Sequence, residues 1–322
     1  MEEKNLTFIA KEVFLEEAKE IELIANRLSN SFSQAVREIF NTNGKLVVCG
    51  IGKSAHIANK IVATLNSTGT PSQFLHAAEA IHGDLGLLQK EDVCLCISNS
   101  GNTPEIKLLS PILKNRAKSL IAITGNTESV LAKTADYVLD ASVSKESGRL
   151  NLAPTSSTTA QLVMGDAIAV ALMELRKFEK QDFAKYHPGG ALGKRLLWRV
   201  DNIVDTSKKP QVSADAPMTE VIDSMTTGKM GITTITDKDN KVLGVITDGD
   251  LRRMLIEHPN FQHLKAKDIA TMHPKKINKT ALAATALDLI RNNSIGQIIV
   301  VDDTDKYYGV LDIHSILAEG IE

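Results

Sequence analysis

The chain has 322 residues, of which 43% are hydrophobic, 24% charged and 4% aromatic, and its formal net charge is -2. This length and composition are typical of a globular protein with more than one domain. The near-neutral charge and the scarcity of aromatic side chains argue against a nucleic-acid partner, which would need a basic face and stacking platforms.

The first 21 residues are acidic and interrupted by charges every few positions, which argues against a signal peptide. The longest apolar run within a predicted helix, AIAVALM, is far shorter than a membrane span. The three cysteines, Cys49, Cys94 and Cys96, are interpreted as small core residues of a reducing compartment. We therefore expect a cytoplasmic protein with no membrane partner.

Residues 8–40 carry apolar side chains in steps of three and four, a spacing that predicts two consecutive helices. The pattern then changes to short runs rich in Val, Ile and Leu, namely KLVVCG, PSQFLH, DVCLCIS, SLIAIT and YVLDAS. Helical stretches lie between most of these runs, and a long helix closes the segment near residue 178. The alternation predicts an α/β fold with a parallel sheet covered on both faces, an αβα sandwich of the flavodoxin-like or Rossmann-like kind.

The remainder of the chain contains an internal repeat. The stretch GVITDGDLRRML begins at Gly244 and GVLDIHSILAEG at Gly309, a shift of 65 residues, and the segments before them align in the same order. Two copies of a β-α-β-β-α unit explain this pattern better than coincidence, because element order, turn residues and period agree. We therefore predict three domains, at residues 1–200, 201–265 and 266–322.

Ligands of open parallel sheets bind at the carboxyl ends of the strands, where this sequence has three unusual turns. The first, CGIGKSAH, offers Gly50 and Gly52 for close backbone approach, with Lys53 and Ser54 at the start of a helix. It lacks the third glycine of a dinucleotide-binding motif, so a tight turn with a surface lysine is the alternative interpretation.

The second turn, CISNSGNTPEI, contains more hydroxyl groups than a helix start needs. Thr103 suits the N-cap and Pro104 the first helical position, which leaves Ser98 and Ser100 without a capping role. Hydroxyl groups ahead of a helix N-terminus form a cradle for an anion, and we prefer a phosphate site to capping alone.

The third turn is the polar loop SKESGRLNLAPTSSTT, which follows the last strand and leads into a helix start with four hydroxyl groups. Glu146 lies in this loop. Taken alone, it is interpreted by default as a solvated carboxylate.

Five stretches together resemble the sugar isomerase (SIS) domain of bacterial D-arabinose-5-phosphate isomerases: CGIGKSAHIANKI, AEAIHGDLG, SNSGNTPEI, LAPTSSTTAQLVMGDAIAVALM and HPGGALGKRLL. The repeats resemble the tandem cystathionine-β-synthase (CBS) domains of the same family, with GVITDGDLRR as the strongest sign. The resemblance implies interconversion of D-ribulose 5-phosphate and D-arabinose 5-phosphate, which supplies 3-deoxy-octulosonate (Kdo) for lipopolysaccharide or capsule. It also implies a homotetramer that requires no cofactor.

The resemblance further implies roles for individual residues. The catalytic positions of the family fall on Lys53, Glu105, Glu146 and His187. The substrate-binding positions fall on Ser54, Ser98, Asn99, Ser100 and Thr103 around the phosphate, and on Gly69, Thr70 and His82 around the sugar. An inhibitory zinc ion is implied at His76, which a helix would bring near Glu79 and His82, although adventitious binding is the more ordinary interpretation of this spacing.

An aldose–ketose isomerase moves a proton between C1 and C2 through a cis-enediolate, so it needs a base, donors for the oxyanion and a group that moves hydroxyl protons. We expect Glu146 to be the base, with Glu105 as the alternative or as the residue that orients Lys53. Lys53 would stabilise the enediolate oxygen. His187 would open the furanose ring, in the site of a neighbouring subunit, and His82 would contact sugar hydroxyls or share the acid–base work.

The repeats carry one match to the ribose-binding pattern of CBS domains, in which Ser or Thr precedes Asp by three residues. The first repeat has Thr247 and Asp250, whereas the second has Asp312 and Ser315 in reverse order. We therefore expect a nucleotide effector at the first repeat at most. A regulatory or assembly role follows, and catalysis should survive removal of residues 201–322.

Two other functions compete with this interpretation. The first is another phosphosugar isomerase of the same fold, because the motifs specify the phosphate better than the stereochemistry of the sugar. The second is a non-catalytic SIS sensor of sugar phosphates. Such regulators usually carry an N-terminal helix-turn-helix, whereas the opening helices here are acidic.

Overall fold

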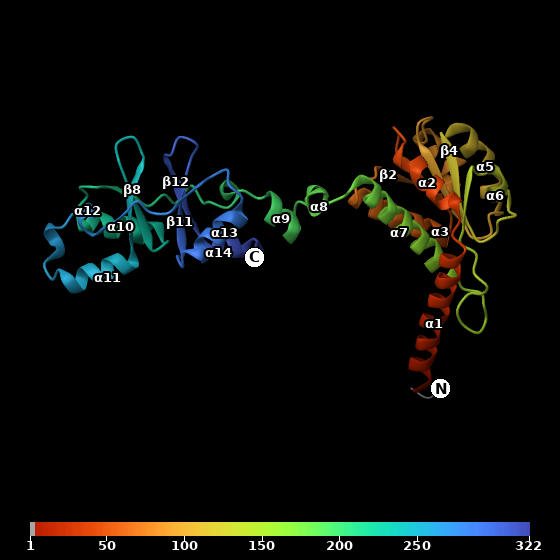
Figure 1. Cartoon of the computed structure of the whole chain (residues 1–322), viewed down its shortest axis with the longest axis horizontal. Coiled ribbons are helices and arrows are strands. Elements are labelled where there is room, and N and C mark those ends of the chain that lie inside the picture. The colour runs from red at the N-terminus through yellow and green to blue at the C-terminus, as the bar shows by residue number, and fades with distance from the viewer. Residues whose placement is uncertain (1–3) are drawn as a thin grey trace. The chain divides into compact units, whose positions relative to one another are not determined.

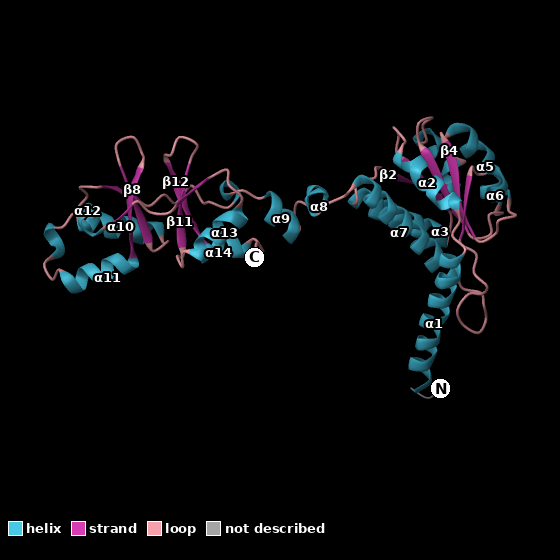
Figure 2. Ribbon diagram, in the orientation of Figure 1, coloured by secondary structure: helices cyan, strands magenta, loops and turns pink. Residues whose placement is uncertain are grey.

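The computed structural model describes residues 4–322, which divide into two compact units (Figure 1). The boundary in the chain falls between Tyr186 and His187. Segment 187–200 thus groups with the repeats, although the sequence had assigned it to the first domain. Figure 2 shows helices and strands alternating in both units.

The first unit opens with two helices, α1 (Lys4–Asn26) and α2 (Asn30–Phe40), as the apolar spacing predicted. Ser29 separates them because its hydroxyl accepts a hydrogen bond from the backbone of Ser31 at the start of α2. Arg27 in the same turn is paired with Asp140, at 3.1 Å, and so ties the helices to the end of the sheet.

A parallel five-stranded sheet forms the centre of this unit, with strand order β2-β1-β3-β4-β5. The strands are β1 (Leu46–Gly50), β2 (Ser72–His76), β3 (Val93–Ser98), β4 (Ser119–Thr124) and β5 (Tyr137–Asp140). The helices that follow β1 are α3 (Lys53–Ser67), α4 (Ala77–Ala80), the 3-10 helix η1 (Asp84–Leu87), α5 (Pro104–Arg116), α6 (Val130–Thr134), α7 (Ser156–Arg176) and α8 (Lys180–Tyr186).

Side chains of the central strands alternate between two buried cores, which makes the αβα sandwich that the sequence predicted. Val48 and Leu95 face the core formed with α1, α2, α3 and α7. Cys49, Cys94 and Cys96 face the other core, formed with α4, α5 and α6, and none of the three is exposed. Burial therefore explains why these strands are continuous apolar runs.

By length and composition, one helix among the described residues, α7, could cross a membrane. Its apolar segment is thus longer than the run AIAVALM suggested. Core helices give the same profile, and the inner side of α7, with Met164, Ile168 and Leu172, is buried in the first core.

Strand order creates a natural ligand site between β1 and β3. The chain leaves β1 toward β2 on one side of the sheet, then crosses to β3 on the other side of β1. Helices α3 and α5, which follow β1 and β3, consequently pack on opposite faces of the sheet. The turns after Gly50 and Ser98 therefore flank the crevice at which open α/β sheets bind ligands.

The second unit contains the two predicted β-α-β-β-α repeats, after helix α9 (Ala191–Leu197) and the 3-10 helix η2 (Val200–Asn202). The first repeat is β6 (Gln211–Ser213), α10 (Met218–Gly228), β7 (Ile232–Thr236), β8 (Val242–Thr247) and α11 (Asp248–Glu257). The connection holds η3 (Phe261–His263), α12 (Ala266–Ile269) and β9 (Thr271–Met272). The second repeat is β10 (Lys276–Asn278), α13 (Ala283–Asn292), β11 (Gln297–Val301), β12 (Tyr307–Asp312) and α14 (Ile313–Ala318).

The two repeats pack on each other through their sheets. A shared apolar cluster joins Ile232 and Val245 of the first repeat to Ile299 and Val310 of the second. Because both repeats contribute to one core, they form a single module.

Candidate active site

The turn after β1 presents an open helix N-terminus at the crevice. Gly52 has φ 58°, a conformation that favours glycine, and no side chain caps α3, which starts at Lys53. A Cβ atom on Gly50 would lie 3.0 Å from the carbonyl oxygen of Ser54, so glycine there lets the helix start against the strand end. Backbone N–H groups of the first turn are therefore available to an anion.

The turn after β3 explains how hydroxyl groups can cap a helix and still bind an anion. Thr103 Oγ1 accepts from the backbone of Ile106 at 3.4 Å, as the sequence predicted for an N-cap. Ser98 Oγ accepts from Gly101 N at 3.1 Å. A hydroxyl that accepts a hydrogen bond keeps its own hydrogen for donation, so these side chains still offer O–H groups to a phosphate.

The rest of this turn is held tightly against β4. The carbonyl of Asn99 accepts from Gly125 N at 2.9 Å, and Gly101 has φ 61°. A Cβ atom on Gly101 would lie 2.2 Å from Ser129 Oγ, which explains the glycine. Asn99 and Ser100 remain exposed at the crevice.

The polar loop after β5 is ordered by Glu146, which is half-buried at the start of α7. Its Oε2 atom accepts hydrogen bonds from Thr155 N at 2.8 Å and from Ser157 N at 3.0 Å. Burial alone would raise the pKa of Glu146, but hydrogen bonds from Ser157 and Thr155 outweigh it and lower that pKa. The carboxylate is therefore ionised at neutral pH. It is held by hydrogen bonds, whereas the default interpretation of the sequence was a solvated surface carboxylate.

Helices α3 and α7 run side by side in the same direction, which brings the first and third turns to one edge of the sheet. Ser54 Oγ donates to Gln161 Oε1 at 3.0 Å near the start of both helices. Further along, Gly165 lies against Ile61, where an added Cβ would be 2.3 Å from the end of the isoleucine. Lys53, Ser54 and Glu146 thus belong to the same edge.

Three residues around Glu146 and Ser54 were not singled out from the sequence. These are Thr155, Ser157 and Gln161. Gln161 is 1% exposed in a helix whose buried face is apolar from Met164 onward. A glutamine at a core position was the available signal, because a buried amide needs a polar partner.

Glu105 and Lys53 both lie at helix starts on this edge, Glu105 half-buried in the first turn of α5 and Lys53 exposed. Within residues 4–322, no ion pair joins Lys53 to Glu105. Lys53 is therefore not oriented by Glu105 in this structure, and the negative charge of Glu105 sits at the positive end of α5.

His76 and His82 follow β2, whose end lies beside the end of β1. His76 Nδ1 is buried without a hydrogen-bond partner, whereas His82 is exposed. Helix α4 covers only Ala77–Ala80, so no continuous helix brings His76, Glu79 and His82 together as the spacing had suggested. Among the described residues, no three His, Cys, Asp or Glu side chains form a group that fits a metal ion.

Gly69 and Thr70 lie away from these turns. They precede β2, and the next residue, Pro71, accepts a backbone hydrogen bond from Leu46 at the start of β1. They therefore sit at the amino edge of the sheet, where Arg176 donates to Thr70 Oγ1. One chain does not bring them together with Ser98 and Thr103.

His187 begins the second unit, so neither unit alone contains all four predicted catalytic residues. Lys53, Glu105 and Glu146 lie in the first unit.

The predicted nucleotide site of the first repeat lies in a cavity of about 520 Å³. Thr247 Oγ1 and Asp250 Oδ2 are 2.7 Å apart and cap α11 reciprocally. Two cationic side chains, Arg253 and Lys275, also line the cavity. In the second repeat Asp312 caps α14 by accepting from Ser315 N, so there the carboxylate takes the position that Thr247 has in the first repeat.

Comparison with known proteins identifies both halves of the chain. Residues 38–171 match the SIS domain, and residues 200–257 and 266–322 match the CBS domain. The arabinose 5-phosphate isomerase KdsD of Pseudomonas aeruginosa is 44% identical over 321 residues, which cover 99% of this chain and 98% of that protein. The protein of the same name from Escherichia coli is 43% identical over 312 residues, covering 97% of this chain and 95% of that protein.

A solved structure shows the same similarity. An Escherichia coli protein in complex with arabinose 5-phosphate is 42% identical, with a TM-score of 0.56, and the match covers 58% of this chain and 100% of that one. Since full-length relatives share more than 40% of their residues with it, this chain belongs to the arabinose 5-phosphate isomerase family, with a SIS domain followed by two CBS domains.

Proposed function

We propose that this chain interconverts D-ribulose 5-phosphate and D-arabinose 5-phosphate, and so supplies Kdo synthesis for lipopolysaccharide or capsule. The observation that carries the proposal is that the neighbouring strands β1 and β3 end in two turns of suitable chemistry, the uncapped start of α3 and the hydroxyl groups of Ser98 and Thr103. Neutral donors at two helix starts suit a phosphate monoester. Relatives named for this activity match the chain from end to end.

The reaction needs a base for the proton on C1 or C2, and Glu146 fits that role best. It is ionised, and its loop joins the edge that holds Lys53 and Ser54. A positioned general base contributes roughly 10²–10⁴-fold to the rate. Glu105 is the second candidate, but a carboxylate in the first turn of α5 would lie close to the bound phosphate and repel it.

The developing oxyanion of the enediolate needs a positive charge, which Lys53 supplies. His187 opens the furanose ring of the aldose, and His82 contacts sugar hydroxyls at the end of β2. Every step is a proton transfer within one substrate, so the reaction balances without an added oxidant, reductant or cofactor.

Glu146→Gln tests this function. The amide keeps the shape of the side chain but cannot accept the carbon-bound proton, so we expect kcat for ribulose 5-phosphate to fall at least about 10²-fold with little change in KM. Turnover is measured by the appearance of aldose, with other pentose and hexose phosphates as alternative substrates. Full activity of Glu146→Gln would contradict the assignment of the base, and turnover of a different sugar alone would contradict the substrate.

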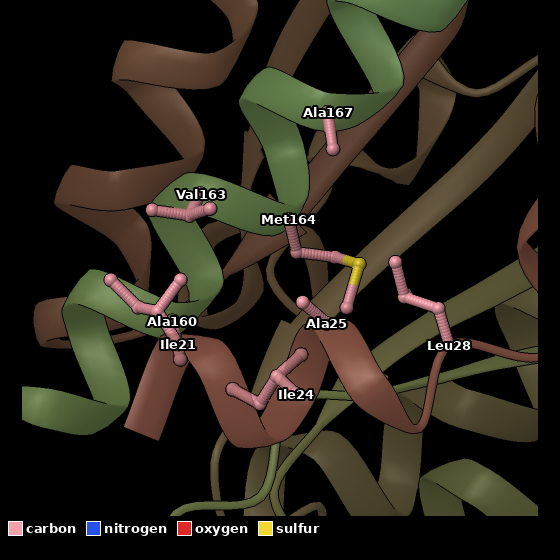
Figure 3. Close-up of a pocket in the computed structure, with 8 residues that line it drawn as sticks. All are labelled: Ile21, Ile24, Ala25, Leu28, Ala160, Val163, Met164 and Ala167. Atoms are coloured by element: carbon pink, nitrogen blue, oxygen red, sulfur yellow. The ribbon is translucent and has the colours of Figure 1, made fainter. Parts of the chain in front are cut away.

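We propose that the chain functions as a homotetramer. Helix α1 exposes large apolar side chains, including Phe8, Phe14 and Leu15, and Phe14 is 79% exposed. A shallow apolar pocket continues this face between α1 and α7 (Figure 3). Its lining consists of Ile21, Ile24, Ala25, Leu28, Ala160, Val163, Met164 and Ala167. An apolar helix face of this extent supports contact with further copies of the chain.

For the repeats, we propose that an anionic nucleotide binds the cavity of the first repeat and acts as an effector. Lys275 provides positive charge there, and Asp250, which is paired with Arg253 and accepts from Thr247, would exchange these partners for a ribose hydroxyl. Calorimetric titration of the whole chain with adenosine mono- and triphosphate tests this, and Asp250→Asn should weaken the binding of both.

The remaining expectations also stay proposals: a cytoplasmic location, no cofactor requirement, no nucleic-acid or membrane partner, and an inhibitory zinc ion at His76. Three buried thiols agree with a reducing compartment. The buried, unpartnered Nδ1 of His76 supports a ligand role. Among the described residues His76 belongs to no group of three possible metal ligands, so we propose that a second copy of the chain supplies the others.

A further inference from the structure

The start of α7 is capped in an unusual way. Thr155 occupies the N-cap, where the hydroxyls of Ser29, Thr103 and Thr247 each accept a hydrogen bond from their own helix. The hydroxyl of Thr155 makes no such bond, and its backbone has φ -132° and ψ -80°. Its hydrogen-bonding capacity is therefore used elsewhere.

The hydroxyl of Thr155 bonds to two groups of the preceding loop, the backbone of Ser147 and the carboxylate of Glu146. Thr155 Oγ1 accepts from Ser147 N at 2.8 Å and donates to Glu146 Oε2 at 3.3 Å. The backbone N–H groups of Thr155 and Ser157 donate to the same carboxylate oxygen. Glu146 thus replaces Thr155 as the cap of α7, and Thr155 fixes the carboxylate.

All these bonds involve one oxygen of the carboxylate. Among residues 4–322, the bonds to this carboxylate from the Thr155 hydroxyl and from the backbone N–H groups all end on Oε2, and the buried hydroxyl of Ser157 beside it also favours the ionised form. A carboxylate anchored through one oxygen keeps the lone pairs of the other for a proton. The backbone on both sides is also tied, because Glu146 N donates to Asn151 Oδ1 and Ser147 N to Thr155.

The neighbouring charges do not compete for this carboxylate. Lys145 is paired with Glu16 of α1, and Glu20 of α1 accepts from Ser144 N at 2.9 Å. Glu17 of α1 accepts from Thr159 Oγ1 at 2.7 Å. The surroundings of Glu146 are therefore acidic on the α1 side, which makes the donors at the start of α7 the groups that keep it ionised.

We propose that Thr155 is a positioning residue for isomerisation: its hydroxyl locks Glu146 through Oε2 and leaves Oε1 directed to the substrate carbon. This inference rests on the proposed function of Glu146 as the base. Thr155 acts through Glu146 and through the Ser147 peptide, and it does not itself touch the substrate.

The test compares Thr155→Val, which removes the hydroxyl at nearly constant shape, with Thr155→Ser, which keeps it. For Thr155→Val we expect kcat to fall roughly 10- to 100-fold, as for loss of a hydrogen bond to a charged group, with KM for ribulose 5-phosphate changed less than about 3-fold. The acidic limb of the kcat profile should move to higher pH, because the ionised carboxylate loses a donor. Thr155→Ser should stay within about 3-fold of the parent.

Thr158→Val is the matched control, since Thr158 Oγ1 bonds to the backbone carbonyls of Pro154 and Thr155 and not to Glu146. It should leave the pH profile unchanged. Should Thr155→Val fail to fold, Thr155→Ala removes the same hydroxyl without the added methyl group.

The inference is overturned if Thr155→Val keeps the parental kcat and pH profile, or if Thr155→Ser is impaired equally. A lower thermal midpoint with unchanged kinetics would make Thr155 a structural residue only, and would also overturn it. Failure of the proposed function gives a different result, because the parent chain would then not convert ribulose 5-phosphate, whereas failure of Glu146 as the base would leave Glu146→Gln active.

Discussion

Lys53 is the residue whose contribution depends most on charge. It lies exposed at the start of α3, and no ion pair to it exists in the part of the chain that the structure describes. The positive charge of Lys53 lies next to the positive end of α3, so its favourable partner is a bound anionic group. The enediolate oxygen is such a group.

Lys53→Met tests that role, because methionine retains the length of the side chain without its charge. We expect kcat to fall roughly 10²–10³-fold at nearly constant KM, as for loss of one oxyanion donor. Steady-state kinetics with ribulose 5-phosphate measure both, and Lys53→Arg should recover part of the rate. A raised KM with unchanged kcat would instead assign Lys53 to phosphate binding.

Asp92 carries a structural charge at the opposite edge of the sheet. It is 3% exposed, and accepts from Lys45 N at 2.9 Å, Gln89 N at 2.9 Å and Lys45 Nζ at 2.8 Å. Burial alone would raise the pKa of Asp92, but the hydrogen bonds from Lys45 and Gln89 lower it below its usual 3.8. Its stabilising contribution is therefore full above that usual value and is lost as the pH falls through the lowered pKa.

For Asp92→Asn we expect the free energy of unfolding to fall by about 1–3 kcal/mol at neutral pH, since three donors lose their charged acceptor. Urea denaturation at a series of pH values measures the effect. The gap between parent and variant should narrow as the pH drops below about 3.8. A gap that stays constant to the lowest pH would show that the carboxylate charge is not the cause.

At this scale the sequence predicts residues whose role is local. Thr103 as N-cap followed from Pro104 directly after it, because a capping side chain bonds to a backbone N–H only three residues further along. Gln161 could not be assigned in the same way, since its partner Ser54 is 107 residues away and becomes evident only when α3 and α7 are packed. Thr155 contacts Glu146 across an irregular loop, whose path has no period in the sequence.

At the scale of elements, helices α3 and α7 approach each other closely where Gly165 faces Ile61. Gly165 lets the two helices approach, because a Cβ atom there would lie 2.3 Å from Ile61 Cδ1 and 2.4 Å from Ile61 Cγ1. Two effects oppose each other in Gly165→Ala. Alanine favours an isolated helix by about 1 kcal/mol, whereas overpacking a core costs about 1–3 kcal/mol.

We expect overpacking to prevail, so Gly165→Ala should lower the free energy of unfolding by about 1–2 kcal/mol. Ile61→Ala removes both of these atoms, Cδ1 and Cγ1, and makes room for the new methyl group. The double variant should therefore be more stable than the sum of the two single effects, as measured by a double-mutant cycle in denaturant. Strict additivity would contradict the proposed contact.

Element order was predictable because strands and helices differ in period, and both repeats were visible from their shift. The region after β2 was less so. Spacing by threes indicated a helix through His76, Glu79 and His82, but α4 ends at Ala80 and Gly83 follows with φ 134°. A positive φ breaks a helix, which the side-chain spacing alone does not reveal.

At the scale of the whole molecule, the residues proposed for catalysis are divided between the two units. Glu146 lies in the first and His187 in the second. If copies associate so that His187 completes a neighbour's site, each site uses one residue from each of two chains.

Mixing Glu146→Gln chains with His187→Ala chains tests this composite site. Each variant alone should be inactive, whereas random mixed oligomers should regain activity at roughly a quarter of the sites. Aldose production measures the recovery, and co-purification through an affinity tag on one variant confirms that mixed oligomers have formed. No recovery in demonstrably mixed oligomers would show that each chain supplies both residues to its own site.

The sealed core beneath α5 has a practical consequence for labelling chemistry. Burial raises the pKa of Cys94; for Cys96, the pKa is raised first by a hydrogen bond with Cys49 and then by burial. With Cys49, Cys94 and Cys96 all inaccessible, thiol reagents should leave the native chain untouched and modify it only as it unfolds. New surface cysteines can therefore carry fluorophores on either unit without removal of a native thiol. The rate at which the three native thiols react then reports how fast the sheet opens.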